Sequence, residues 1–205
     1  GYIGSHAVNR LLDEGRSVVV ADNLTAGHRE VVDLLCRNSR TPAERRGDLA
    51  AQIAACRVGE RRLQGIVERY GWDETHAHMD ALLDYAERLT RAAVREVPDG
   101  QYAFRDFMDD DGVGGERLPI QATVRVRGDE MEVDFTGTAP ETSGCINAPF
   151  AIAVSAVLYV VRSIAGEGVP ANEGVMRPVR VHAPEGCLVN PRPPRAVAGG
   201  NVETS

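Results

Sequence analysis

Four polar residues lie in or beside apolar or glycine-rich turns in the second half of the sequence. Asp134 belongs to "DFTGT", Asn147 to "CINAP", and Asn201 and Glu203 to "GGNVETS". Side chains in such turns can face a pocket, where carboxylate and amide groups bind or activate a substrate. Hydrogen bonding at a hairpin end and turn formation explain the same residues equally well. We predict these four as the candidate catalytic residues and keep both interpretations open.

Two further groups of side chains have the composition of a metal site but not its spacing. The run "DDDG" at residues 109–112 suggests a calcium loop, yet Phe107 and Leu118 occupy positions where an EF-hand has oxygen ligands. His76 and His78 would lie about 200° apart around a helix, so they cannot share an ion there. We therefore predict a solvated turn, exposed histidines and no metal-binding residues.

The first residues have the pattern of part of a dinucleotide-binding turn. Gly1 and Gly4 precede an apolar helical run, and Asp22 and Asn23 follow the apolar run "SVVVA". Glycines let the backbone approach a pyrophosphate, and the carboxylate accepts hydrogen bonds from a ribose. This segment, residues 1–31, resembles UDP-glucose 4-epimerases and other extended short-chain dehydrogenases. The family's leading strand and first glycine do not precede Gly1, so we expect an incomplete Rossmann-like αβ fragment that does not bind NAD.

The composition excludes several classes of function. All 23 basic residues are arginine, so the chain has no phosphate-loop lysine, no Schiff-base lysine and no Tyr-x-x-x-Lys pair of short-chain dehydrogenases. A net charge of -7 argues against nucleic acid or an acidic membrane as a partner. The four cysteines form no C-x-x-C pair, which favours reduced thiols in a cytoplasmic protein. The apolar run at residues 150–161 is too short to span a bilayer.

The middle of the chain predicts two long amphipathic helices. Thr41 can cap the first, with Pro42 at its first position and Glu44 completing a capping box. Gly71 ends this helix, and Asp73 can cap a second one that runs to the turn "PDG". Apolar residues recur at helical spacing through both segments. We expect a long helical hairpin.

The sequence beyond this hairpin predicts mostly β-structure. "QYAFRDFM" is a candidate strand, and "IQATVRVRGDEMEVDFTG" alternates around Gly128 and Asp129 as a β-hairpin does. Residues 151–164 predict a buried helix that begins near Pro149, and "MRPVRVHA" predicts another strand. The remainder is rich in loop residues. The predicted fold class is therefore α+β, with the helical hairpin followed by β-hairpins and one buried helix.

Several stretches occur in the order and spacing of a known family. They are "RTPAERRGDLAAQIAACRVGERRL", "MDALLDYAERLTRAAVREVPDGQY", "DDDGVGG", "VDFTGTAPETSGCINAP" and "NPRPPRAVAGGNVETS". From about residue 38 to residue 205 the chain resembles the hydantoinase B/oxoprolinase family. We therefore predict three parts: an epimerase-like fragment at residues 1–31, a junction at 32–40, and a hydantoinase B/oxoprolinase-like segment at 41–205.

The resemblance implies ATP-dependent hydrolysis of a cyclic amide, which opens a hydantoin or 5-oxoproline ring. It implies a partner, a hydantoinase A-type ATPase subunit or domain that binds the ATP, and a divalent metal in the complete enzyme. The family's metal-binding stretch lies upstream of the helical hairpin, where this chain has the epimerase-like fragment. We therefore expect the chain alone to be inactive. The alternatives are a remnant of an NAD-dependent nucleotide-sugar epimerase and a non-catalytic segment that docks a partner through its helices.

Overall fold

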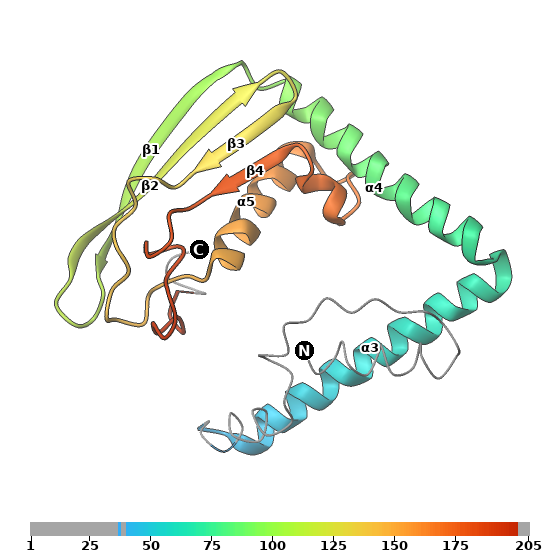
Figure 1. Cartoon of the computed structure of the whole chain (residues 1–205), viewed down its shortest axis with the longest axis horizontal. Helices are drawn as coiled ribbons and strands as arrows, with labels where there is room; N and C mark the ends of the chain where they lie inside the picture. Colours follow the sequence, from blue (N-terminus) through green and yellow to red (C-terminus); the bar gives the residue numbers. More distant parts are fainter. Residues whose placement is uncertain (1–36, 38–39, 201–205) are drawn as a thin grey trace. The chain divides into compact units, whose positions relative to one another are not determined.

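The computed structural model of the chain describes residues 37 and 40–200 (Figure 1). The chain divides into two compact units, Gly1–Thr75 and His76–Ser205. The predicted Rossmann-like fragment, with Gly1, Gly4, Asp22 and Asn23, lies outside the described residues.

The first predicted helix forms as α3 (Pro42–Tyr70). Pro42 stands in its first turn as predicted, but the Thr41 side chain makes no capping hydrogen bond. Thr41 has a ψ of 74°, outside the extended conformation that directs a capping hydroxyl onto the first turn, so the predicted capping box with Glu44 is wrong. Gly71 ends the helix at a φ of +83°, which glycine adopts without strain, and its N–H donates to the carbonyl of Val67.

The second predicted helix is α4 (Trp72–Arg95). It begins one residue before the predicted cap, and Asp73 lies in its first turn. Within the second unit, the part of α4 from His76 onward buries the side chains of Ala86, Thr90 and Val94. The Thr90 hydroxyl donates to the carbonyl of Ala86 at 2.9 Å, so its burial leaves no polar group unsatisfied.

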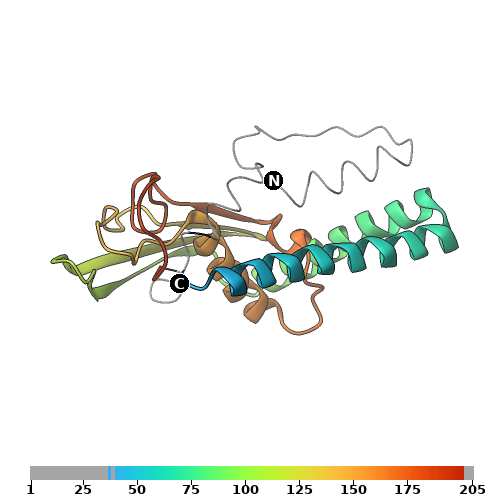
Figure 2. The ribbon, with the colours of Figure 1, turned by 90° about the horizontal axis from the view of Figure 1, so that it is seen from below.

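The second unit contains one four-stranded sheet in the order β1-β2-β3-β4. The strands are β1 (Gly100–Asp110), β2 (Glu116–Arg127), β3 (Glu130–Asp134) and β4 (Val179–His182). The first three are antiparallel, while β4 pairs parallel to β3. Figures 1 and 2 show that β1 and β2 extend beyond the two shorter strands. The predicted hairpin at Gly128 and Asp129 is confirmed.

The parallel pairing of β3 with β4 requires a crossover, which contains α5 (Phe150–Ala165) and the short 3₁₀ helix η1 (Glu173–Met176). Helix α5 begins after Pro149, as predicted. It buries Ala153, Val157 and Val161, which share one face because they are four residues apart. Tyr159, on another face, is 76% exposed, so the predicted buried helix is buried on one face only.

One face of the sheet carries the hydrophobic core. Alternate residues of β2 and β3 point to this face because side chains in a strand have a period of two. They pack with apolar residues of α4, α5 and β4, and the buried members are Ala86, Val94, Val126, Met131, Val133, Val157, Val161, Val169, Val175 and Val179. The core therefore holds β3 and β4 in place, and the loops that follow these two strands contain the site described below.

An ion-pair network attaches the end of α4 to the β2–β3 turn. The Arg91 side chain donates from Nε to Glu87 at 2.8 Å and from Nη1 to Asp129 at 3.0 Å. Arg95 also donates to Asp129. Because the side chains of Arg91 and Asp129 are 25% and 28% exposed, water screens this pair less than an exposed surface pair.

Two expectations about the chain's environment concern its cysteines and its helices. Among the described residues, Cys56, Cys145 and Cys187 are free thiols, as predicted. Within the same residues, no helix has both the length and the apolar character needed to cross a bilayer.

Candidate functional site

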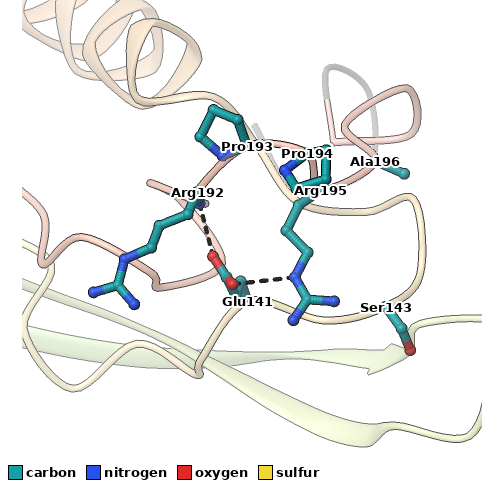
Figure 3. A pocket seen from close by; sticks show the side chains of 7 residues that line it. All are labelled: Glu141, Ser143, Arg192, Pro193, Pro194, Arg195 and Ala196. Carbon is teal, nitrogen blue, oxygen red and sulfur yellow. Dashed lines mark hydrogen bonds and ion pairs between the residues drawn. The ribbon is translucent and has the colours of Figure 1, made fainter.

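A pocket of about 440 Å³ lies between two loops of the second unit (Figure 3). Glu141 and Ser143 line it from the loop that follows β3. Residues 192–196 line it from the loop that follows β4. These two loops are some 50 residues apart in the sequence, so the pocket exists only in the folded chain.

Glu141 connects the two loops. Its carboxylate accepts a hydrogen bond from the backbone N–H of Arg192 at 2.7 Å and another from Nε–H of Arg195 at 3.1 Å. These bonds, the backbone one first, hold the pKa of Glu141 below its ordinary value of 4.5. Glu141 is therefore ionised at neutral pH and orients Arg195 rather than serving as a proton donor.

The side chains of Arg195 and Ser143 retain hydrogen-bonding capacity towards the pocket. Among the described residues, the Nη1 and Nη2 groups of Arg195 have no hydrogen-bond or ion-pair partner, and neither has the Ser143 hydroxyl. In the view of Figure 3, Arg195 extends from Glu141 towards Ser143, and Arg192 extends away on the other side. The Nε of Arg192 lies 3.7 Å from the carboxylate of Glu185. The pocket therefore presents unused hydrogen-bond donors on Arg195 and Ser143.

Asn147 is fully buried beside this pocket. Its Oδ1 accepts from the backbone N–H of Thr142 at 2.8 Å. Its Nδ2 group contacts three carbonyl oxygens, those of Thr142 at 3.1 Å, Gly144 at 2.9 Å and Ala196 at 2.9 Å. This amide therefore holds the pocket's two loops together, and its hydrogen-bonding groups are all engaged within the chain.

Two glycines continue the contact between these loops. The N–H groups of Gly199 and Gly200 donate to the carbonyl of Cys145 at 2.9 and 3.2 Å. A Cβ atom at Gly200 would overlap the carbonyl oxygen of Asn147, so only glycine permits this approach. The predicted catalytic residues Asn201 and Glu203 follow directly in the sequence and lie outside the described residues.

The acidic run at residues 109–112 covers the end of β1, at Asp109 and Asp110, and the start of the predicted turn, at Asp111 and Gly112. The Asp111 carboxylate accepts from the N–H groups of Val113 at 3.0 Å and Gly115 at 2.7 Å. These two bonds are the main cause of a pKa below the ordinary 3.8. Asp111 is only 7% exposed, so the prediction of a solvated turn is wrong for this one residue. Its burial is possible because the turn's own N–H groups satisfy the charge.

No metal cluster forms among the described residues: no group of three or more His, Cys, Asp or Glu side chains there could hold an ion. His76 and His78 are exposed, as predicted. The possible metal ligands among residues 40–200 therefore do not form a site that fits a divalent metal.

Asp134 occupies a different environment from Asn147. It ends β3 on the polar side of the sheet, where its carboxylate accepts from the N–H of Thr136 at 2.9 Å and lies 3.4 Å from Nη1 of Arg125. The bonds from Thr136 are the largest cause of its lowered pKa. Asp134 does not line the pocket.

Comparison with known proteins places this arrangement of helices, sheet and loops in a family. The family model described as hydantoinase B/oxoprolinase matches residues 8–205. The chain belongs to the hydantoinase B/oxoprolinase family. The match begins at residue 8, inside the predicted epimerase-like fragment. A separate origin for residues 1–31 and a junction at 32–40 stay predictions.

Two relatives and one solved structure illustrate the similarity. The chain is 39% identical over 166 residues to caprolactamase subunit beta of Pseudomonas jessenii, covering 80% of this chain and 28% of that protein. It is 32% identical over 174 residues to 5-oxoprolinase of Saccharomyces cerevisiae, covering 83% of this chain and 13% of that protein. The crystal structure of the ATP-dependent caprolactamase from Pseudomonas jessenii matches 86% of this chain with a TM-score of 0.74 and 36% identity.

This hydantoinase B/oxoprolinase chain spans a minor part of its relatives. It covers 31% of the solved caprolactamase chain and 28% and 13% of the two curated relatives. The activity, substrates and partners of a complete relative are therefore proposals when they are applied to this chain.

The sequence predicted Asp134, Asn147, Asn201 and Glu203 as site residues and missed the four polar residues that line the pocket. These are Glu141 and Ser143, in the quoted stretch "VDFTGTAPETSGCINAP", and Arg192 and Arg195, in the quoted stretch "NPRPPRAVAGGNVETS". Two arginines spaced by prolines in a loop are a usable signal, because proline stiffens the backbone and leaves the guanidinium groups as its main donors.

Proposed function

We propose that this chain is a segment of the B-type subunit of an ATP-dependent cyclic-amide hydrolase that opens a hydantoin or 5-oxoproline ring. The observation that carries the proposal is family membership over residues 8–205, together with the match to a caprolactamase crystal structure at 36% identity and a TM-score of 0.74. The matched relatives named above act on related rings, a lactam and 5-oxoproline.

The proposed partner is a hydantoinase A-type ATPase subunit or domain, which would bind the ATP. Caprolactamase is named as having a beta subunit and as ATP-dependent, which supports both expectations. A divalent metal is part of the family's chemistry, but the donor set of residues 40–200 does not fit one. We therefore assign no reaction step in this chain to a metal, and we place the proposed enzyme in the cytoplasm.

The experiment is a segment exchange. Residues 41–205 of this chain replace the matching segment of the Pseudomonas jessenii caprolactamase beta subunit, and ring opening is followed by chromatography with and without ATP. We expect ATP-dependent ring opening by the exchanged enzyme. A folded exchanged subunit that still assembles with its partner but opens no ring would contradict the proposal.

A control addresses the separate expectation that the chain alone is inactive. The purified chain is incubated with ATP, the caprolactamase partner subunit and either hydantoin or 5-oxoproline. We expect no ring opening, because the chain covers only 28% and 13% of the two curated relatives named above. Measurable turnover would overturn this expectation and leave the proposed reaction intact.

A non-catalytic docking role is favoured by one observation. Helix α3 has no buried residue, and its apolar side chains Leu63, Ile66 and Tyr70 are 39%, 47% and 55% exposed. Exposed apolar surface of this kind is typical of a protein interface. Light scattering after size-exclusion chromatography tests this role: self-association or stability only with a partner supports it, and a stable monomer contradicts it.

A further inference from the structure

The pocket holds an arginine whose orientation is fixed by other residues. Glu141 accepts from Nε of Arg195, and the backbone N–H of Arg195 donates to the carbonyl of Arg192 at 3.1 Å. The N–H of Glu141 in turn donates to the carbonyl of Gly186 at 2.9 Å. Because Asn147 binds the carbonyl of Ala196, the next residue, the backbone at this point is also held from the other loop.

The donors that remain are suited to an anion. Arg195 has one edge occupied by Glu141, which leaves Nη1 and Nη2 without a partner among the described residues. Two parallel N–H groups of one guanidinium match the two oxygens of a carboxylate or phosphoryl group. Ser143 lines the same pocket, and its hydroxyl can rotate to donate a third hydrogen bond. Pro193 and Pro194 have no N–H groups, so they supply no donors to a ligand in the pocket.

The charged residues that line the pocket are Arg192, Arg195 and Glu141. Arg192 extends away from Ser143, and its Nε lies 3.7 Å from Glu185, with the two side chains 60% and 73% exposed. The free edge of Arg195 therefore supplies the positive charge of the site. The volume of about 440 Å³ accommodates a small organic molecule that carries such a group.

We infer that the Nη1 and Nη2 groups of Arg195 and the hydroxyl of Ser143 form an oxyanion-binding site for the carboxylate or phosphoryl group of a small substrate. The inference rests on the proposed function only for the source of the ligand. Opening a cyclic amide releases a carboxylate, and ATP-dependent activation produces a phosphorylated compound. Both ligands present the oxygen atoms that this site can bind.

The experiment is a titration of the full 205-residue chain labelled with ¹⁵N, followed through the Nε–Hε signals of arginine. The probes are inorganic phosphate and acetate, each compared with sodium chloride at equal ionic strength. We expect saturable shifts of the Arg195 signal in the millimolar range with at least one probe. Saturation by phosphate alone identifies a phosphoryl site, and saturation by acetate identifies a carboxylate site. No saturable response to either probe overturns the inference.

Three variants show whether these donors bind the anion. Two of them lack the Arg195 Nε–Hε signal, so binding to every variant is followed through the backbone N–H signals of Ser143 and Ala196, which line the pocket. We expect Arg195→Gln to weaken binding about tenfold and Ser143→Ala about threefold. Arg195→Lys keeps the charge but not the paired donors, so it should also weaken binding, and wild-type affinity in this variant would overturn the role of the guanidinium edge. The matched control is Arg180→Gln, since Arg180 has a side chain that is 78% exposed and lies outside the pocket lining.

Folding and function are separated by two further readouts. Circular dichroism and thermal unfolding identify any variant whose loops have lost their structure. The titration uses neither ATP nor a ring substrate, so its failure leaves the segment-exchange result untouched. A failed segment exchange likewise leaves a measured anion affinity standing.

Discussion

The side-chain amide of Asn147 donates a hydrogen bond of 2.9 Å to the carbonyl oxygen of Ala196, 49 residues further along the chain. This bond joins the loop after β3 to the loop after β4, and both loops line the pocket. A polar residue that sequence analysis predicted as catalytic thus has a positioning role in the fold. Whether it also contacts substrate is still a prediction.

Replacement of Asn147 should strongly destabilise the second unit. Asn147→Ala leaves three carbonyl groups and one N–H without this partner, and we expect a loss of about 2–4 kcal/mol in the free energy of unfolding. Denaturant unfolding followed by circular dichroism measures it. The control is Ser155→Ala. The Ser155 hydroxyl donates to the carbonyl of Ala151 on the exposed side of α5, so this variant should change stability by less than about 0.5 kcal/mol. Equal stability of the two variants would contradict this role of Asn147.

Stability should fall in acid partly through Glu141. The fold lowers the pKa of Glu141, so its contribution is fully present above its unfolded value of about 4.5. That contribution is lost as the pH falls through the lower pKa of the folded state. We expect Glu141→Gln to be less stable than wild type at pH 7, and the difference to shrink below pH of about 4.5. Unfolding experiments between pH 7 and pH 3 test this, and a difference independent of pH would refute it.

Gly144 should not tolerate a side chain. A Cβ atom there would overlap the backbone carbonyl oxygen of Asp111, which cannot move without opening the turn. We expect Gly144→Ala to cost at least about 2 kcal/mol in thermal unfolding. The matched control is Gly168→Ala, because a Cβ at Gly168 meets nothing within 4 Å and should change stability by less than about 1 kcal/mol. Similar melting temperatures for both variants would contradict the close contact.

The pair Arg91 and Asp129 should be energetically coupled. A double-mutant cycle with Arg91→Met and Asp129→Asn should give a coupling of about 0.5–1.5 kcal/mol, which decreases at high salt because ions screen the pair. The comparison pair is Arg180 and Glu130, at 3.6 Å and with side chains 78% and 53% exposed, whose coupling should be close to zero. The proposal that this contact anchors α4 to the sheet fails if the two couplings are equal.

NAD should not bind this chain. The predicted cofactor residues are Gly1, Gly4, Asp22 and Asn23. The last two lie within residues 8–205, which match the hydantoinase B/oxoprolinase family model, so we do not expect this segment to act as a dinucleotide-binding turn. Calorimetric titration with NAD up to millimolar concentration should show no saturable heat. Tight, saturable binding would instead support the alternative of a nucleotide-sugar epimerase remnant.

Elements with a strong local pattern were predictable. The period of 3.6 predicted α3 and α4, and alternation around Gly128 predicted the β2–β3 hairpin, because both periods arise from the geometry of a single element. Helix α5 was predicted from its apolar composition after Pro149. The capping box at Thr41 was wrong because a cap depends on one backbone angle that composition does not specify. The solvated environment expected for Asp111 was wrong because the loop at Gly144 packs against it, a contact between segments that the local sequence does not specify.

The sequence by itself therefore determined the family, the α+β class and most of the helices and strands, since each of these depends on order and spacing along the chain. Only the tertiary structure decided that β4 pairs parallel to β3 and that Glu141 meets Arg192 and Arg195. It also decided that Asn147 is saturated with internal hydrogen bonds. The physical reason is that a pocket is made of contacts between distant segments. The hydrophobic core selects those contacts when it fixes where each strand ends.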